Sequence, residues 1–75
     1  MNAVQTKLGK AVRAARKTRG WSQEDLAGQT GLDRTYISGI ERGVRNPTIS
    51  SIARIADALG LSIHELVRPL ADADS

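Results

Sequence analysis

Arg34, Thr35 and Tyr36 follow one another in this chain of 75 residues, and all three side chains can contact the edges of bases. An arginine can donate two hydrogen bonds to one guanine, and a threonine can donate, accept or touch a thymine methyl group. A tyrosine adds a flat apolar ring and a hydroxyl. The run begins after Asp33 and its segment ends at Gly43, as in a short helix between a capping residue and a glycine stop. The start of this helix is therefore a candidate surface for reading nucleic acid.

Five short helices are expected in the chain, because apolar residues at helical spacing alternate with capping residues, glycines and prolines. We predict helices over residues 4–18, 23–29, 34–42, 49–59 and 63–68. The apolar face of the first should begin at Val4, the inward stripe of the fourth should begin at Ile49, and Pro69 should end the fifth. The predicted fold class is all-α, a compact five-helix domain over residues 1–70 followed by a short, acidic, disordered tail at 71–75.

The segment 22–43 has the pattern of a helix-turn-helix, in which two short helices join through a turn centred on Gly31. Ile37 and Ile40 should face inward, which leaves the other side of the second helix free to enter a DNA major groove. The residues on or near that outer side are predicted to read bases: Arg34, Thr35, Tyr36 and Ser38. For Tyr36 an alternative stays open, in which its ring packs on Ile40 or on a neighbouring helix.

Basic residues gather in the first part of the chain. Up to residue 45 it carries nine lysines and arginines against four acids, and the remainder carries two against four. This imbalance favours an anionic partner. Five side chains are predicted to meet the DNA backbone: Lys7, Arg16, Arg42, Arg45 and Asn46. A solvated charge at Arg45 and a simple turn residue at Asn46 remain alternatives.

Composition argues against several classes of function. The chain has no cysteine and one histidine, so neither a disulfide nor a metal site is expected. A thin core leaves no room for a catalytic cleft, and no arrangement of residues suggests a nucleophile or a cofactor. We therefore do not expect an enzyme. No apolar run approaches the roughly 18 residues of a membrane span, so we expect a cytoplasmic protein.

The run WSQEDLAGQTGLDRTYISGIERGVRNPTISSIARIADALGLSIHELV resembles the Cro and lambda-repressor family of helix-turn-helix regulators, and the likeness extends over about Leu8 to Val67. It is also similar to the small controller proteins of restriction–modification systems, which share a Thr-Tyr-Ile-Ser recognition helix. The resemblance implies that Gln23 contacts a phosphate and that Arg16 pairs with Glu41. Gly39 departs from the family, which often has a long polar side chain there, so base reading should concentrate in the first turn of the recognition helix.

We therefore expect a transcriptional regulator that binds a pseudo-palindromic, double-stranded DNA operator as a homodimer, since one recognition helix reads too few base pairs for useful specificity. The dimer interface is predicted from apolar residues of the fourth and fifth helices: Ile55, Ile63, Leu66, Val67 and Leu70. RNA polymerase is a further candidate partner. The alternative function is an antitoxin-like regulator that binds both DNA and a second protein, although the tail is short for wrapping a partner.

Overall fold

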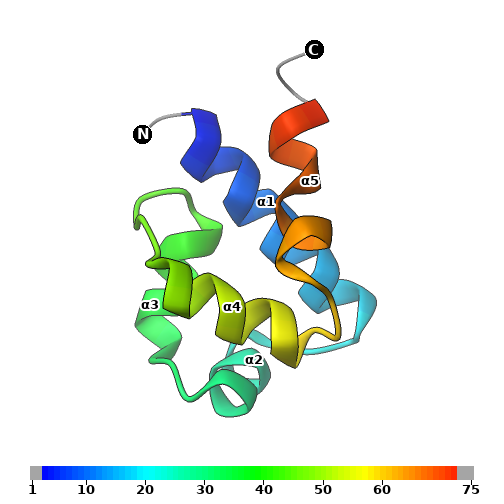
Figure 1. Cartoon of the computed structure of the whole chain (residues 1–75). Coiled ribbons are helices and arrows are strands. Elements are labelled where there is room, and N and C mark those ends of the chain that lie inside the picture. Colours follow the sequence, from blue (N-terminus) through cyan, green and yellow to red (C-terminus); the bar gives the residue numbers. More distant parts are fainter. Residues whose placement is uncertain (1–2, 73–75) are drawn as a thin grey trace.

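The computed structural model describes the backbone of residues 3–72 and the side chains of residues 3–68. Its helices are α1 (Ala3–Thr18), α2 (Gln23–Thr30), α3 (Arg34–Glu41), α4 (Ile49–Ala58) and α5 (Ile63–Asp72), as Figure 1 shows. No strand occurs among these residues, so the prediction of an all-α, five-helix fold is confirmed. The first four helices begin and end within one residue of their predicted bounds.

Side-chain caps explain where the helices begin. The Ser22 hydroxyl accepts a hydrogen bond from the Asp25 N–H at 3.0 Å, and the Asp25 carboxylate accepts one from the Ser22 N–H at 2.8 Å. Ser62 and Glu65 make the same reciprocal pair at the start of α5. Single side-chain caps begin α3 and α4: Asp33 and Thr48. Because each cap satisfies backbone N–H groups that have no partner inside the helix, these four helix starts are set by local sequence.

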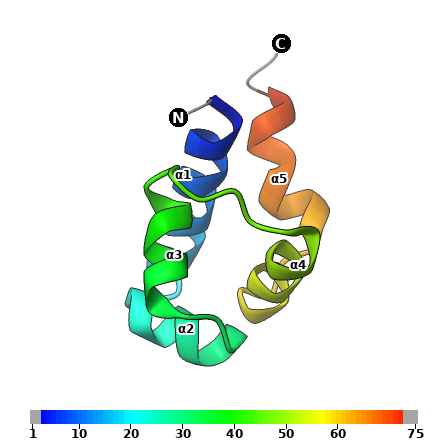
Figure 2. The same ribbon diagram turned by 90° about the vertical axis from the view of Figure 1, so that its left-hand side faces the viewer.

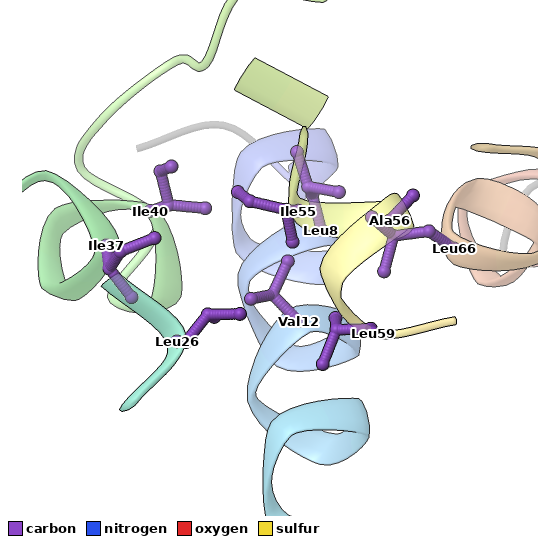
Figure 3. Close-up of a cluster of buried hydrophobic side chains, with 9 residues drawn as sticks. All are labelled: Leu8, Val12, Leu26, Ile37, Ile40, Ile55, Ala56, Leu59 and Leu66. Atoms are coloured by element: carbon purple, nitrogen blue, oxygen red, sulfur yellow. The ribbon is translucent and has the colours of Figure 1, made fainter. Parts of the chain in front are cut away.

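One aliphatic core joins all five helices (Figure 3). Its buried members are Leu8, Val12, Leu26, Ile37, Ile40, Ile55, Ala56, Leu59 and Leu66. Ile37 and Ile40 supply the contribution of α3, and both point from that helix toward the other labelled side chains in Figure 3. Because burial of these two isoleucines turns one side of α3 inward, the opposite side of the helix faces out of the molecule.

Two positions predicted to face the core lie on the surface. Val4 is 59% exposed and Ile49 is 73% exposed. Both residues belong to the first turn of a helix, α1 or α4, where they continue the helical spacing of the buried residues but are not themselves buried. Periodicity identifies the side of a helix that faces the core, but it does not show how far along the helix the core extends.

The prediction that Pro69 ends the fifth helix is wrong, because α5 continues to Asp72. A proline has no N–H, so Pro69 removes one backbone hydrogen bond, the one to the carbonyl of Glu65. Proline in general has φ near the helical value, so a helix can continue after that single loss. The tail predicted at 71–75 therefore begins inside α5, and residues 73–75 lie outside the described part of the chain.

Candidate nucleic-acid interface

The helix-turn-helix consists of α2, a sharp turn and α3, and Figure 2 views the molecule from the side on which α3 lies. Gly31 makes the turn with φ of +74°, and its N–H donates to the Ala27 carbonyl at 2.9 Å. Thr30 is buried, and its hydroxyl donates to the Leu26 carbonyl at 2.9 Å and accepts from the Leu32 N–H at 3.2 Å. Thr30 therefore satisfies the polar groups of the turn, a role that nothing in the sequence pattern indicated.

The outer side of α3 presents unpaired polar side chains. Arg34 and Thr35 are exposed, and Ser38 is half-buried. Among the described residues, no hydrogen bond or ion pair engages the Arg34 guanidinium or the hydroxyls of Thr35 and Ser38. Asp33 instead accepts from the backbone N–H of Thr35 at 2.9 Å, which fixes the first turn of the helix. These side chains are thus held on a rigid element with their own donors and acceptors free.

Tyr36 points away from this free set. Its hydroxyl donates to the Ser51 hydroxyl on α4 at 3.3 Å, and Ser51 also accepts from the Thr48 hydroxyl at 3.0 Å. The Arg45 guanidinium lies over the Tyr36 ring, 5.7 Å from its centroid. The alternative in which Tyr36 packs toward a neighbouring helix is therefore the arrangement in the structure. Ser51, which is buried, gave no signal in the sequence beyond its place in the first turn of a helix.

The Arg16–Glu41 ion pair inferred from the family resemblance is present. Arg16 donates to the Glu41 carboxylate from Nε at 2.7 Å and from Nη2 at 2.9 Å, and it donates from Nη1 to the Trp21 carbonyl at 2.7 Å. The hydrogen bonds to Glu41 raise the pKa of Arg16 above its ordinary value, against the opposing effect of burial. Gln23 Nε2 donates to the same carboxylate at 3.1 Å, so one side chain of α3 is bonded to both α1 and α2.

This network changes the roles of two predicted phosphate contacts. Arg16 is 8% exposed, and its guanidinium donates to Glu41 and to the Trp21 carbonyl, so the ion pair occupies most of this side chain. Its contact with the DNA backbone stays a prediction. Gln23 is half-buried, and its amide nitrogen carries a second N–H besides the one donated to Glu41. That second N–H, at the start of α2, keeps Gln23 a candidate for a phosphate contact.

Gly9, which was not among the predicted functional residues, sets how closely α1 approaches α3. A Cβ at this position would collide with the Ile40 carbonyl oxygen and lie 2.6 Å from the Glu41 carbonyl oxygen. Only glycine therefore lets the backbone of α1 cross the end of the recognition helix at this distance. A glycine inside an otherwise helical pattern is the signal that could have revealed it.

The remaining predicted backbone contacts gather at the end of α3. Arg42, Arg45 and Asn46 are exposed in the loop between α3 and α4, and Lys7 is half-buried on α1. The start of α1 touches this loop, because a Cβ at Gly43 would lie 3.0 Å from the Thr6 Cα. Lys7, the next residue, therefore belongs to the same end of the molecule as the loop.

The apolar residues predicted for a dimer interface divide into two groups. Ile55 and Leu66 are 1% and 2% exposed within a single chain, so they belong to its own core and offer no surface to a partner. Ile63, 40% exposed, and Val67, half-buried, keep apolar surface on α5. The side chain of Leu70 lies outside the described set.

Within residues 3–72, no helix is long and apolar enough to cross a membrane. Among the described side chains, no group of three or more histidine, aspartate or glutamate residues could hold a metal ion. The unpartnered polar side chains that suit a ligand include those on the outer side of α3, Arg34 and Thr35.

Known proteins resemble this chain in both sequence and structure. The helix-turn-helix family model matches residues 12–66. The chain is 48% identical over 58 residues to the Neisseria hypothetical transcription factor of Neisseria meningitidis, which covers 77% of this chain and 55% of that protein. The restriction–modification controller protein C.AhdI from Aeromonas hydrophila has a TM-score of 0.85 at 43% identity, covering 87% of this chain and 98% of that one. The controller protein C.Esp1396I, solved as a tetramer in complex with its natural 35 base-pair operator, has a TM-score of 0.83 at 39% identity, covering 95% and 99%.

Proposed function

Because this chain belongs to the helix-turn-helix family, we propose that it regulates transcription by binding double-stranded DNA as a homodimer, with α3 in the major groove. The observation that carries the proposal is the outer side of α3. Arg34 and Thr35 are exposed there, and their side chains have no hydrogen-bond partner among the described residues. Base edges offer the acceptors and donors that these side chains lack, and Arg34 in the first turn suits the paired acceptors of a guanine.

Contacts to the DNA backbone would hold this helix in register. Candidates flank α3: the second N–H of Gln23 on one side, and Arg42, Asn46 and Lys7 on the other. Such contacts orient a protein on the duplex without reading its sequence. They also predict strong salt dependence, because each neutralised phosphate releases counterions.

The proposed dimer pairs two copies through α5, with Ile63 and Val67 at the contact. A two-fold dimer places its two recognition helices about one DNA turn apart, which corresponds to a pseudo-palindromic operator with half-sites roughly 10 base pairs apart. The tetramer of C.Esp1396I on its operator is a precedent for self-association on DNA in a similar protein.

The similarity to controller proteins favours a narrower role as well. The chain spans about half the length of the Neisseria relative, but nearly the whole of C.AhdI and C.Esp1396I. We infer that it works, like these small proteins, as a transcriptional regulator in a restriction–modification system. Its operator should then lie upstream of a restriction gene, and run-off transcription from that promoter would show repression, or activation through RNA polymerase.

Selection of bound sequences from random duplex DNA tests the central proposal. We expect an enriched pseudo-palindrome. On that duplex, a dimer that neutralises six or more phosphates should lose on the order of a thousandfold in affinity between about 50 and 200 mM salt. No enriched sequence, or binding that salt does not weaken, would exclude a sequence-specific DNA-binding function.

A further inference from the structure

Gly39 leaves a gap on the outer side of the recognition helix. It lies one helical turn after Thr35, so the two residues share a side of α3. Although its position faces outward, Gly39 is buried, because another part of the chain covers it. A Cβ at position 39 would collide with Arg45 Cγ and lie 3.3 Å and 3.6 Å from Arg45 Cβ and Cδ. The apolar stem of Arg45 therefore occupies the space that a side chain at position 39 would fill.

Backbone hydrogen bonds hold Arg45 in this place. The Gly39 carbonyl accepts from the Val44 N–H at 3.0 Å and from the Arg45 N–H at 3.2 Å. The loop after α3 consequently folds back onto the helix from which it emerges. Its arginine stem crosses Gly39 as a direct result of this backbone geometry.

The guanidinium of Arg45 is oriented at its far end by Tyr36. It lies over the Tyr36 ring at 5.7 Å from the centroid, a distance at which a cation is attracted to an aromatic face. The ring is itself fixed through its hydroxyl to Ser51. No carboxylate or carbonyl among the described residues accepts from the Arg45 guanidinium, so its donors are oriented but free.

We propose that Arg45 is a specificity-determining residue that reads a base in the major groove from the position Gly39 leaves empty. This inference rests on the proposed function, and it replaces the expectation that Arg45 contacts only phosphate. An ordinary recognition helix would carry a reading side chain one turn beyond Thr35. Here the loop supplies it, and the planar guanidinium fork of Arg45 matches the O6 and N7 acceptors of a guanine.

The proposal predicts that Gly39 and Arg45 act as one unit. Gly39→Ala adds a methyl group that the Arg45 stem cannot avoid without moving, and alanine favours the helix more than glycine does. This variant should therefore keep its melting temperature or raise it. It should nevertheless lose base preference at the same operator position as Arg45→Ala.

Operator duplexes that carry each single-base change in both half-sites provide the test. Binding of the parent, Arg45→Ala, Arg45→Lys, Gly39→Ala and the matched control Arg42→Ala would be measured by fluorescence anisotropy at fixed salt. We expect Arg45→Ala, Arg45→Lys and Gly39→Ala to lose about 5- to 150-fold of discrimination at one shared base pair. Their discrimination at the other base pairs should stay as in the parent. Arg42→Ala should weaken binding to all duplexes by one common factor.

Three results would overturn the inference. The first is a uniform loss for Arg45→Ala, which describes a phosphate contact. The second is full base preference in Arg45→Lys, which would show that the planar guanidinium fork is not what reads the base. The third is an unchanged preference in Gly39→Ala, which would show that the gap does not position Arg45. A parent protein without any sequence preference would instead refute the proposed function, so the parent measurement distinguishes the two failures.

Discussion

Glu41→Ala should remove a large share of the stability of this domain, because one carboxylate holds three helices together. It accepts from Arg16 Nε at 2.7 Å, from Arg16 Nη2 at 2.9 Å and from Gln23 Nε2 at 3.1 Å. The Glu41 side chain is 3% exposed and the Arg16 side chain is 10% exposed. Since water has little access to the pair, it cannot replace the acceptor that the substitution removes.

The expected cost follows from leaving a buried cation unpaired. Removal of one partner from a buried ion pair destabilises a protein by about 3–5 kcal/mol. A domain of this length has an unfolding free energy on the order of 4–11 kcal/mol, so Glu41→Ala should remove at least about a quarter of it. At about 4–8 °C per kcal/mol, the melting temperature should fall by about 12 °C or more.

Thermal unfolding followed by far-ultraviolet circular dichroism measures this effect. The matched control is Glu24→Ala, which removes an exposed acid without a partner among the described residues and should cost about 1 kcal/mol or less. The double variant Arg16→Met with Glu41→Leu removes both charges and should recover most of the lost stability. A melting temperature for Glu41→Ala within about 3 °C of the parent would refute the reasoning, because it would mean that water solvates the pair.

Further predictions concern reading, assembly and pH. Arg34→Ala should cost about 1–3 kcal/mol of binding free energy per half-site and relax preference at one base pair, as measured by binding to single-base operator variants. If the substitution weakened binding to all duplexes by one common factor, Arg34 would be a phosphate contact. Ile63→Lys should give monomers in sedimentation at micromolar concentration, whereas Ile49→Lys, on an isoleucine outside α5, should not; a monomeric parent would contradict the interface. Hydrogen bonds from the start of α5 lower the pKa of Glu65 below its ordinary 4.5, so its capping box stabilises the fold above that value and loses its effect as pH falls through the lowered pKa. Glu65→Gln, which keeps the cap without titrating, should flatten the acid side of a series of melting curves; an unchanged acid limb would assign the pH dependence to other groups.

Local signals account for the parts of this fold that were predictable. The starts of α2 and α5 depend on two reciprocal pairs, Ser22 with Asp25 and Ser62 with Glu65, whose members lie three residues apart. Such bonds form inside one turn, so the residue types and their spacing are sufficient evidence. The side of α3 that faces outward was predictable for the same reason, because the helical period fixes it relative to Ile37 and Ile40.

The features that were missed depend on contacts between distant segments. Gly9 and Gly39 both permit a close approach, one to carbonyl groups at the end of α3 and the other to the stem of Arg45. A glycine in a sequence signals conformational freedom or a close approach, but it does not identify the group that approaches. Tyr36 is similar, since its bond to Ser51 depends on where α4 lies relative to α3.

The contacts of α3 would make the proposed base reading depend on the packing of this helix at both ends. Asp33 fixes the first turn by accepting from the Thr35 N–H, and Glu41 attaches the last turn to Arg16 and to Gln23. Base-specific hydrogen bonds require donors placed within a few tenths of an ångström, whereas a buried ion pair contributes little net stability compared with apolar residues of similar volume. The more consistent role of the pair is therefore orientational: it sets the angle of the recognition helix against α1 and α2. Gly9 on α1 acts in the same way, because it determines how closely α1, which carries Arg16, approaches α3, which carries Glu41.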